Sequence, residues 1–105
     1  MYELKKDKYS EARGNGSRIL AITCSHCNSL VAYYQKDGPG ILKRLYFDRI
    51  IDRKFNKNDL KCSKCSRVLG AFNIYEKENR KAIRLFVGAV NKKIISRSKV
   101  ALHSQ

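Results

Sequence analysis

The sequence predicts a single, mainly β domain made of antiparallel hairpins that meet at one metal site. A length of 105 residues suits one domain with a modest core. Short runs rich in β-branched and aromatic residues alternate with turn-forming residues along most of the chain. All four cysteines fall in two Cys-X-X-Cys pairs of identical spacing, Cys24 with Cys27 and Cys62 with Cys65. Together these features favour a small β fold that a metal reinforces.

Each cysteine pair predicts a tight turn that aims both sulfurs at one point. Two such turns supply the four thiolates that tetrahedral zinc prefers. We therefore expect one structural zinc site, with Cys24, Cys27, Cys62 and Cys65 as its ligands. A single iron, two disulfides or a redox dithiol are the alternatives for these thiols. His26 lies inside the first pair and could replace one cysteine, although four sulfurs already complete the shell.

The chain divides by composition into three parts. Residues 1–17 mix charges with glycine and serine and hold few large apolar side chains, so we expect a mobile basic arm. Residues 18–95 hold both cysteine pairs and form the predicted zinc-binding β domain, and residues 96–105 are a polar tail. No apolar run approaches the roughly 20 residues of a membrane span. Residues 2–8 do not resemble a signal peptide, so we expect a cytoplasmic protein with no membrane partner.

Two runs with strand composition flank the first cysteine pair, at residues 18–23 and 29–34. Their β-branched and aromatic residues predict a hairpin whose tip holds the metal. The following Gly38-Pro39-Gly40 predicts a turn, because glycine reaches positive φ and proline fixes its own. A glycine-rich turn followed by Lys43-Arg44 could also cradle a phosphate group, although it does not match the Walker pattern.

The segment between the cysteine pairs is ambiguous. Residues 41–51 fit either a strand or one face of a helix by periodicity, and the turn before them favours a strand. Residues 52–59 are polar and predict a connection, with Phe55 as its anchor.

A second hairpin is predicted after the second cysteine pair. Residues 67–76 and 82–90 alternate apolar and polar side chains, and residues 77–80 between them have turn composition. Residues 91–95 could extend the second strand of this hairpin.

The run from Leu60 to Glu76 resembles the second half of Yippee-type domains, in which a cysteine knuckle precedes Leu-Gly and an aromatic strand. The wider group is the zinc-binding β-tent, or Mss4-like, fold, and its order of strands and knuckles is similar to residues 19–90. The resemblance implies that the four cysteines ligate zinc and that Leu69-Gly70 starts a packed strand. Two departures are the short, 34-residue gap between the knuckles and Ala71, where an aromatic residue is common. A zinc ribbon is the alternative fold.

The chain is strongly basic, with 23 lysine and arginine residues against 9 acidic ones and a formal charge of +14. Such an excess attracts phosphate backbones, so we expect a nucleic-acid partner, with RNA favoured over DNA. Bases could stack on exposed members of the set Tyr33, Tyr34, Tyr46 and Tyr75. The residues predicted to neutralise phosphates are Lys43, Arg44, Arg49, Arg53, Lys54, Lys61, Lys64, Arg67 and Arg84.

Several other functions stay open at this point. The β-tent group includes proteins with unrelated functions, so the resemblance does not select one. An adaptor could dock an acidic protein surface, and plain solubility could also account for the charge. A small-ligand pocket would require aromatic side chains that converge on a hollow away from the metal. We expect no enzyme, because four cysteines leave zinc no open position and leave no thiol as a nucleophile.

Overall fold

The computed structural model describes residues 3–14, 16–51 and 59–97, which form two antiparallel sheets and one short α-helix. In chain order the elements are α1 (Lys8–Ala12), β1 (Ser17–Cys24), β2 (Leu30–Asp37), β3 (Arg44–Tyr46), the 3-10 helix η1 (Phe47–Arg49), β4 (Ile50–Ile51), β5 (Asp59–Lys61), β6 (Val68–Tyr75), β7 (Arg80–Leu85) and β8 (Val90–Ile95). One four-stranded sheet has the order β4-β2-β1-β8 and the other the order β3-β7-β6-β5. The predicted mainly β class is therefore confirmed.

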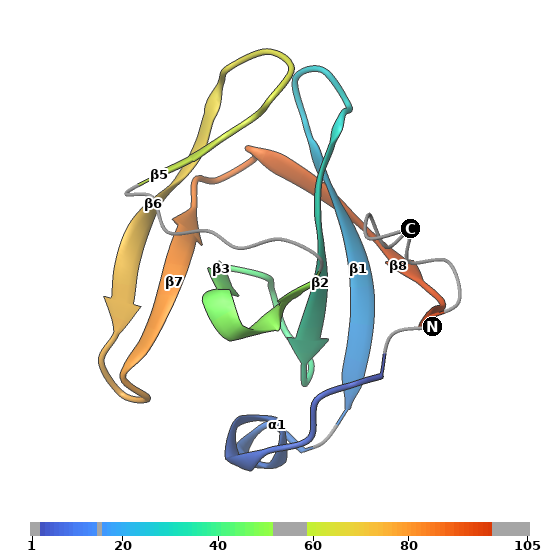
Figure 1. Cartoon of the computed structure of the whole chain (residues 1–105), viewed down its shortest axis with the longest axis vertical. Coiled ribbons are helices and arrows are strands. Elements are labelled where there is room, and N and C mark those ends of the chain that lie inside the picture. Colours follow the sequence, from blue (N-terminus) through green and yellow to red (C-terminus); the bar gives the residue numbers. More distant parts are fainter. Residues whose placement is uncertain (1–2, 15, 52–58, 98–105) are drawn as a thin grey trace.

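The two sheets lean against each other at one end of the molecule. Figure 1 shows them close together where the cysteine loops lie and spread apart toward α1. The space between the sheets is filled by one apolar cluster, in which Leu45, Leu69 and Ile83 have no exposed surface. Burial of such side chains is the main force that holds two sheets face to face.

The first predicted hairpin is confirmed as β1 and β2. The strands pair antiparallel from Ser17 opposite Asp37 to Thr23 opposite Leu30. A register shift after Ile22 bends the hairpin just before the first cysteine loop. The predicted hairpin after the second cysteine pair is likewise confirmed as β6 and β7, which pair from Gly70 to Tyr75.

The prediction that this hairpin's second strand continues to Val90 is wrong. β7 ends at Leu85, and after a loop the chain enters β8, which pairs with β1 in the other sheet. Gly88 in the loop has a φ of +73°, which an extended strand does not accommodate. The apolar alternation of residues 82–90 therefore spans a crossover between sheets, which a period-two pattern does not reveal.

The prediction of one strand over residues 41–51 is also wrong. The chain forms the short β3, turns through η1 and then forms β4 in the opposite sheet. This turn buries the guanidinium of Arg49 among carboxylates, which a straight strand would not allow. The predicted connection falls on residues 52–59, of which only Asp59 is described, as the first residue of β5; its predicted anchor Phe55 lies outside the described residues.

The N-terminal segment differs from the predicted mobile arm. Asp7 caps α1 by accepting hydrogen bonds from two backbone N–H groups of the helix, and its carboxylate pairs with Arg49 at 2.6 Å. Arg13, just after the helix, donates two hydrogen bonds to Glu78 in the turn between β6 and β7. The segment thus docks through ion pairs, whereas its low apolar content predicted no docking. No described helix is long and apolar enough to cross a membrane.

Gly70 in β6 permits the close contact between β6 and β7. A Cβ atom at this position would lie 2.5 Å from the carbonyl oxygen of Arg84 and 2.7 Å from Cγ2 of Ile83. We expect Gly70→Ala to destabilise the fold by about 1–3 kcal/mol, because neither neighbour can move without breaking the sheet. Gly16→Ala is the control, since its Cβ would meet no atom within 4 Å. Chemical denaturation of both variants tests this, and equal stabilities would contradict it.

Candidate metal centre and basic face

The two cysteine loops repeat one backbone geometry. In each loop the first cysteine donates its N–H to the carbonyl five residues later, Cys24 to Ser29 and Cys62 to Arg67. Its own carbonyl accepts the N–H of the residue four positions later, which in both loops has a φ of +64°. Register shifts also occur at the same distance before each loop. Two equal spacings in the sequence therefore fold into two equal turns.

These turns place the four thiols in one cluster. The sulfurs of Cys24 and Cys65 lie 3.7 Å apart, those of Cys27 and Cys62 lie 3.4 Å apart, and all four fall within 4.8 Å of one another. Four sulfurs at the corners of a tetrahedron, each about 2.3 Å from a central zinc, would be separated by about 3.8 Å. The donor set and its spacing therefore fit a tetrahedral metal ion.

The surroundings of the first loop favour the thiolate form that metals bind. Hydrogen bonding with the Ser29 hydroxyl and the Ser29 backbone N–H lowers the pKa of the Cys27 thiol to about 6. Backbone N–H groups of Cys27 and His26 point at the Cys24 sulfur and lower its pKa, although burial opposes this shift. Donors preset toward a sulfur reduce the free energy needed to deprotonate it.

The structure also bears on two alternatives for the cysteines, a pair of disulfides and His26 as a metal ligand. All four lie in the described part of the chain and are free thiols, which argues against two disulfides. The cluster of metal-binding groups that the described residues form contains these four sulfurs and not the exposed His26. Cys24 and Cys62 are buried, so the cluster lies at the edge of the apolar core.

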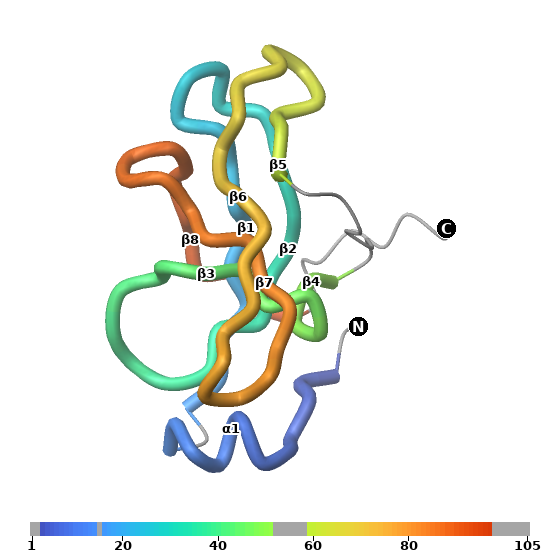
Figure 2. The backbone as a smooth tube through the Cα atoms, turned by 90° about the vertical axis from the view of Figure 1, so that its left-hand side faces the viewer, coloured from blue at the N-terminus to red at the C-terminus, as the bar shows by residue number. Residues whose placement is uncertain are grey.

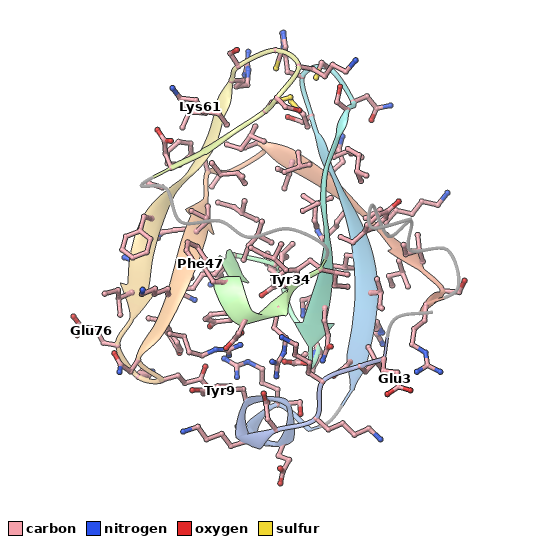
Figure 3. All side chains as sticks on the ribbon, in the orientation of Figure 1. Glu3, Tyr9, Tyr34, Phe47, Lys61 and Glu76 are labelled. Carbon is pink, nitrogen blue, oxygen red and sulfur yellow. The ribbon has the colours of Figure 1, made fainter. Side chains whose placement is uncertain are left out.

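The nine predicted phosphate-binding residues do not share one surface. Lys61, Lys64 and Arg67 are exposed at or beside the second cysteine loop, where Figure 3 labels the first of them. Lys43, Arg44 and Arg84 instead line a groove that contains none of those three residues. Arg53 and Lys54 lie outside the described residues.

The assignment of Arg49 to the binding surface is wrong. Its side chain is 1% exposed and pairs with Asp37 at 2.8 Å and with Asp7 at 2.6 Å. The expectation that Tyr34 could stack on a base is also wrong, because this residue is buried and its hydroxyl accepts the backbone N–H of Tyr46. Sequence alone does not distinguish such buried groups from solvated ones.

The described ion pairs gather acidic side chains at the α1 end of the molecule. Arg80, also buried, pairs with Asp48 at 2.6 Å and with Glu78 at 3.0 Å. The residues that take part in the ion pairs at this end are Arg13, Arg49, Arg80, Asp7, Asp37, Asp48 and Glu78. Four carboxylates are thereby paired with arginines at this end of the molecule and do not offset the positive charge elsewhere.

A second group of cations gathers on one side of the molecule, around the loop of residues 38–43. Arg18 lies opposite Lys36 in the pairing of β1 with β2, and Arg44 lies opposite Arg84 in the pairing of β3 with β7. Lys92 of β8 lines one hollow with the first pair and another hollow with the second pair. We call this surface the basic face; its members are Arg18, Lys36, Lys43, Arg44, Arg84 and Lys92.

Three of these cations are not among the nine residues predicted to bind phosphate. Arg18, Lys36 and Lys92 come from three different strands, and only the order of the sheet brings them together. Figure 2 shows the loop before β3 and the loop between β7 and β8 projecting on the same side of the fold, at the left of that view. The alternation of β1 and β2 could have paired Arg18 with Lys36, but nothing local indicates where β8 lies.

A groove of about 530 Å³ runs between those two loops. Its walls combine the cations Lys43, Arg44, Arg84 and Lys92 with apolar side chains, and none of the described residues that line it is acidic. Phe86 is 48% exposed and Val87 is fully exposed beside it. The groove therefore offers positive charge and apolar contact area together.

Comparison with known proteins gives no match of any kind: no family model, no curated protein and no solved structure is similar to this chain. The geometry of the metal centre and of the basic face therefore carries the functional argument.

Proposed function

We propose that the protein is a zinc-stapled β domain that binds nucleic acid, with single-stranded RNA as the favoured partner, through its basic face. The observation that carries the proposal is the gathering of six cations, five from five different strands and Lys43 from the loop before β3, none of which pairs with a described acidic residue. The convergence of two sheets at the cysteine loops supports the β-tent resemblance. Four thiolates would fill the tetrahedral shell of zinc, which supports a structural zinc and a binding role without catalysis, in a reducing, cytoplasmic setting.

Repulsion within the basic face supports a polyanionic partner. Burial lowers the pKa of Lys36, and the nearby charges of Arg18 and Lys92 lower it further. The fold thus holds like charges together at a free-energy cost that a row of phosphates would remove. Release of the counterions condensed on nucleic acid adds a further favourable term.

The apolar wall of the groove favours a single strand over a duplex. A duplex presents mainly phosphates and sugars at its surface, whereas a single strand also exposes base faces. Phe86 lies half-exposed between the cations of the groove and could stack on such a base. Tyr75, by contrast, already carries the Arg44 guanidinium on its ring at 4.5 Å.

The same groove supports one alternative, an adaptor that docks an acidic protein segment. Ile41 and Val87 are strongly exposed, and cations surround them. An apolar patch with a charged rim is typical of protein interfaces. A peptide that contains acidic and apolar residues, used as a competitor of RNA, distinguishes this alternative from nucleic-acid binding.

The test compares two double variants in RNA binding. We expect the metal-loaded protein to bind a labelled single-stranded RNA with an affinity that falls steeply with salt. Replacing Arg84 and Lys92 with glutamine should weaken binding about tenfold or more and reduce the salt slope by about 1.4, for two phosphate contacts. Replacing Lys61 and Lys64 with glutamine removes the same charge near the second cysteine loop and should change binding much less. Fluorescence anisotropy over a salt series measures both effects.

Equal losses in the two double variants would contradict the basic face as the binding surface. Binding that disappears at modest salt for RNA and DNA alike would contradict a nucleic-acid function, and competition only by the acidic peptide would favour the adaptor. Duplex RNA, duplex DNA and single-stranded DNA complete the comparison, because only a preference that survives near physiological salt identifies the partner.

A further inference from the structure

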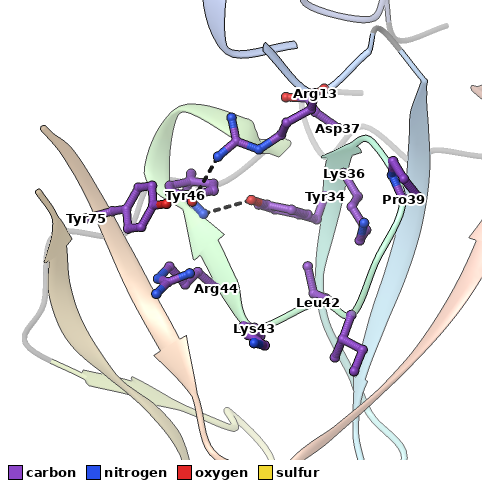
Figure 4. Close-up of a pocket in the computed structure, with 11 residues that line it drawn as sticks. Arg13, Tyr34, Lys36, Asp37, Pro39, Leu42, Lys43, Arg44, Tyr46 and Tyr75 are labelled. Carbon is purple, nitrogen blue, oxygen red and sulfur yellow. Dashed lines mark hydrogen bonds between the residues drawn. The ribbon is translucent and has the colours of Figure 1, made fainter. Parts of the chain in front are cut away.

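A third hollow, of about 270 Å³, lies under the loop of residues 38–43 at one edge of the basic face. Figure 4 shows Lys36 and Leu42 on one side, Tyr46 and Tyr75 on the other, and Arg44 between Tyr75 and Lys43. Small-molecule pockets usually measure roughly 300–1,000 Å³. The hollow is slightly smaller than this range, which suits a phosphate group with part of a nucleotide, and no cysteine lines it.

The positive charge of this hollow is not neutralised by Asp37, the one acidic residue among the described residues that line it. Asp37 is 4% exposed and accepts hydrogen bonds from Arg49, Ser17 and Gln35, so its charge is already balanced. Arg13, which also lines the hollow, is paired with Glu78. The surplus charge therefore comes from Lys36, Lys43 and Arg44.

Arg44 is held in place without using its hydrogen bonds. Its guanidinium stacks on the Tyr75 ring at 4.5 Å, and Tyr46 supports that ring edge-on at 5.9 Å. No described carboxylate pairs with Arg44, and its Nε–H is buried with no partner among the described residues. Buried donors are seldom left unpaired, and those that are commonly mark a functional site. A stacked guanidinium with free N–H groups is a favourable donor for an oxyanion.

Lys36 supplies a second donor that is fixed in place. Its ammonium donates to the carbonyl of Gly38 at 2.7 Å, and its two further N–H donors have no acceptor among the described residues. Gly38 has a φ of +75°, and a Cβ there would lie 2.7 Å from the Arg13 carbonyl oxygen. The tight turn at Gly38 therefore sets the wall of the hollow, in the glycine-rich stretch that the sequence marked as a possible phosphate cradle.

We propose that this hollow binds a phosphate group of a nucleotide, with Arg44 and Lys36 as the donors and Lys43 as supporting charge. The inference rests on the proposed nucleic-acid function and specifies where one phosphate of the strand is held. The phosphate oxygens accept hydrogen bonds from both side chains, and Tyr46 and Tyr75 form the adjoining wall of the hollow. Free phosphate has the same oxyanion chemistry, so the test must separate the two sources.

Nuclear magnetic resonance of the metal-loaded, ¹⁵N-labelled protein tests the site with adenosine monophosphate, inorganic phosphate and adenosine as probes. We expect the first two to shift the Arg44 Nε–H signal and the Lys36 amide signal saturably, and adenosine to shift neither. Tighter binding of the nucleotide than of free phosphate identifies the nucleotide as the source, and equal affinities identify the phosphate group alone. No shift from either phosphate at about 10 mM would overturn the proposal.

Two variants separate this site from the rest of the basic face. Arg44→Gln should weaken nucleotide and RNA binding each by about tenfold or more, because it removes a charged donor. Arg84→Gln, which lies outside the hollow, should weaken RNA binding more than it weakens nucleotide binding. Lys36→Gln serves as a second test if Arg44→Gln lowers the melting temperature.

The outcomes keep the two proposals distinguishable. RNA binding that persists while nucleotide and phosphate cause no shift overturns the phosphate site and leaves the proposed function standing. Nucleotide binding at Arg44 and Lys36 without RNA binding supports the site and overturns the nucleic-acid function.

Discussion

Cys62→Ser is expected to abolish the cooperative unfolding transition of the protein. Cys62 is buried, and its sulfur lies 3.4 Å from that of Cys27, so it joins the hairpin of one sheet to that of the other. Binding of structural zinc contributes about 10 kcal/mol or more to folding in small domains. Whole domains are stable by only about 5–15 kcal/mol, so losing one of four ligands removes most of that stability.

Circular dichroism during heating, with and without a chelator, measures this loss. His26→Ala is the matched control, because His26 lies in the other cysteine loop, is exposed and takes no part in the sulfur cluster. The control should keep one bound metal and the melting temperature of the original protein, and Cys62→Ser should keep neither. Elemental analysis identifies the metal as zinc or iron. A native transition that survives complete removal of metal would show that the cysteines do not staple the fold.

Local sequence patterns predicted those parts of the fold that depend on neighbours in the chain. Equal Cys-X-X-Cys spacing predicted the sulfur cluster, and runs of β-branched residues predicted the hairpin of β1 with β2 and that of β6 with β7. Each hairpin and each cysteine loop closes within a few residues, and the four sulfurs are then brought together by the preference of one metal ion for four thiolates. Local propensity is therefore enough to determine it.

Features that depend on distant contacts could not be predicted in the same way. β8 continues the apolar run of β7 in sequence but crosses to the other sheet, where it pairs with β1. In the sequence Arg49 cannot be distinguished from the other basic residues. Only the fold brings it into contact with Asp7 and Asp37, which are 42 and 12 positions away. Net charge likewise predicted a basic surface, while the membership of that surface depends on sheet order.

Arg49→Met is expected to destabilise the protein by about 3–5 kcal/mol at neutral pH, the usual cost of removing one partner from a buried ion pair. Methionine fills much the same volume but leaves the carboxylate of Asp37, which is 4% exposed, without a cation. It also removes the ion pair through which Asp7, and with it α1, is held. Arg67→Met is the control, because Arg67 is exposed and forms no ion pair with a described residue, and it should change stability by no more than about 0.5 kcal/mol.

The effect of Arg49→Met should depend on pH in a defined direction. The hydrogen bond from Arg49 lowers the pKa of Asp7 to about 2. Burial raises the pKa of Asp37, but hydrogen bonds from Ser17, Gln35 and Arg49 outweigh burial and the net shift is downward. A carboxyl group whose pKa is lower in the folded state stabilises that state above its unfolded pKa, which is about 3.9 for aspartate. This stabilisation is lost as the pH falls through the folded value.

The difference in unfolding free energy between the original protein and Arg49→Met should therefore be largest above about pH 4 and shrink toward pH 2. At low pH both carboxyls are protonated in either protein, so neither needs a cation. Removing Arg49 also takes away one of the hydrogen bonds that lower the pKa of Asp37, so this carboxyl loses its charge at a higher pH in the variant than in the original protein. Urea denaturation across this range measures the difference. A difference that stays constant with pH would mean that Arg49 stabilises the fold by packing alone and not by its ion pairs with Asp7 and Asp37.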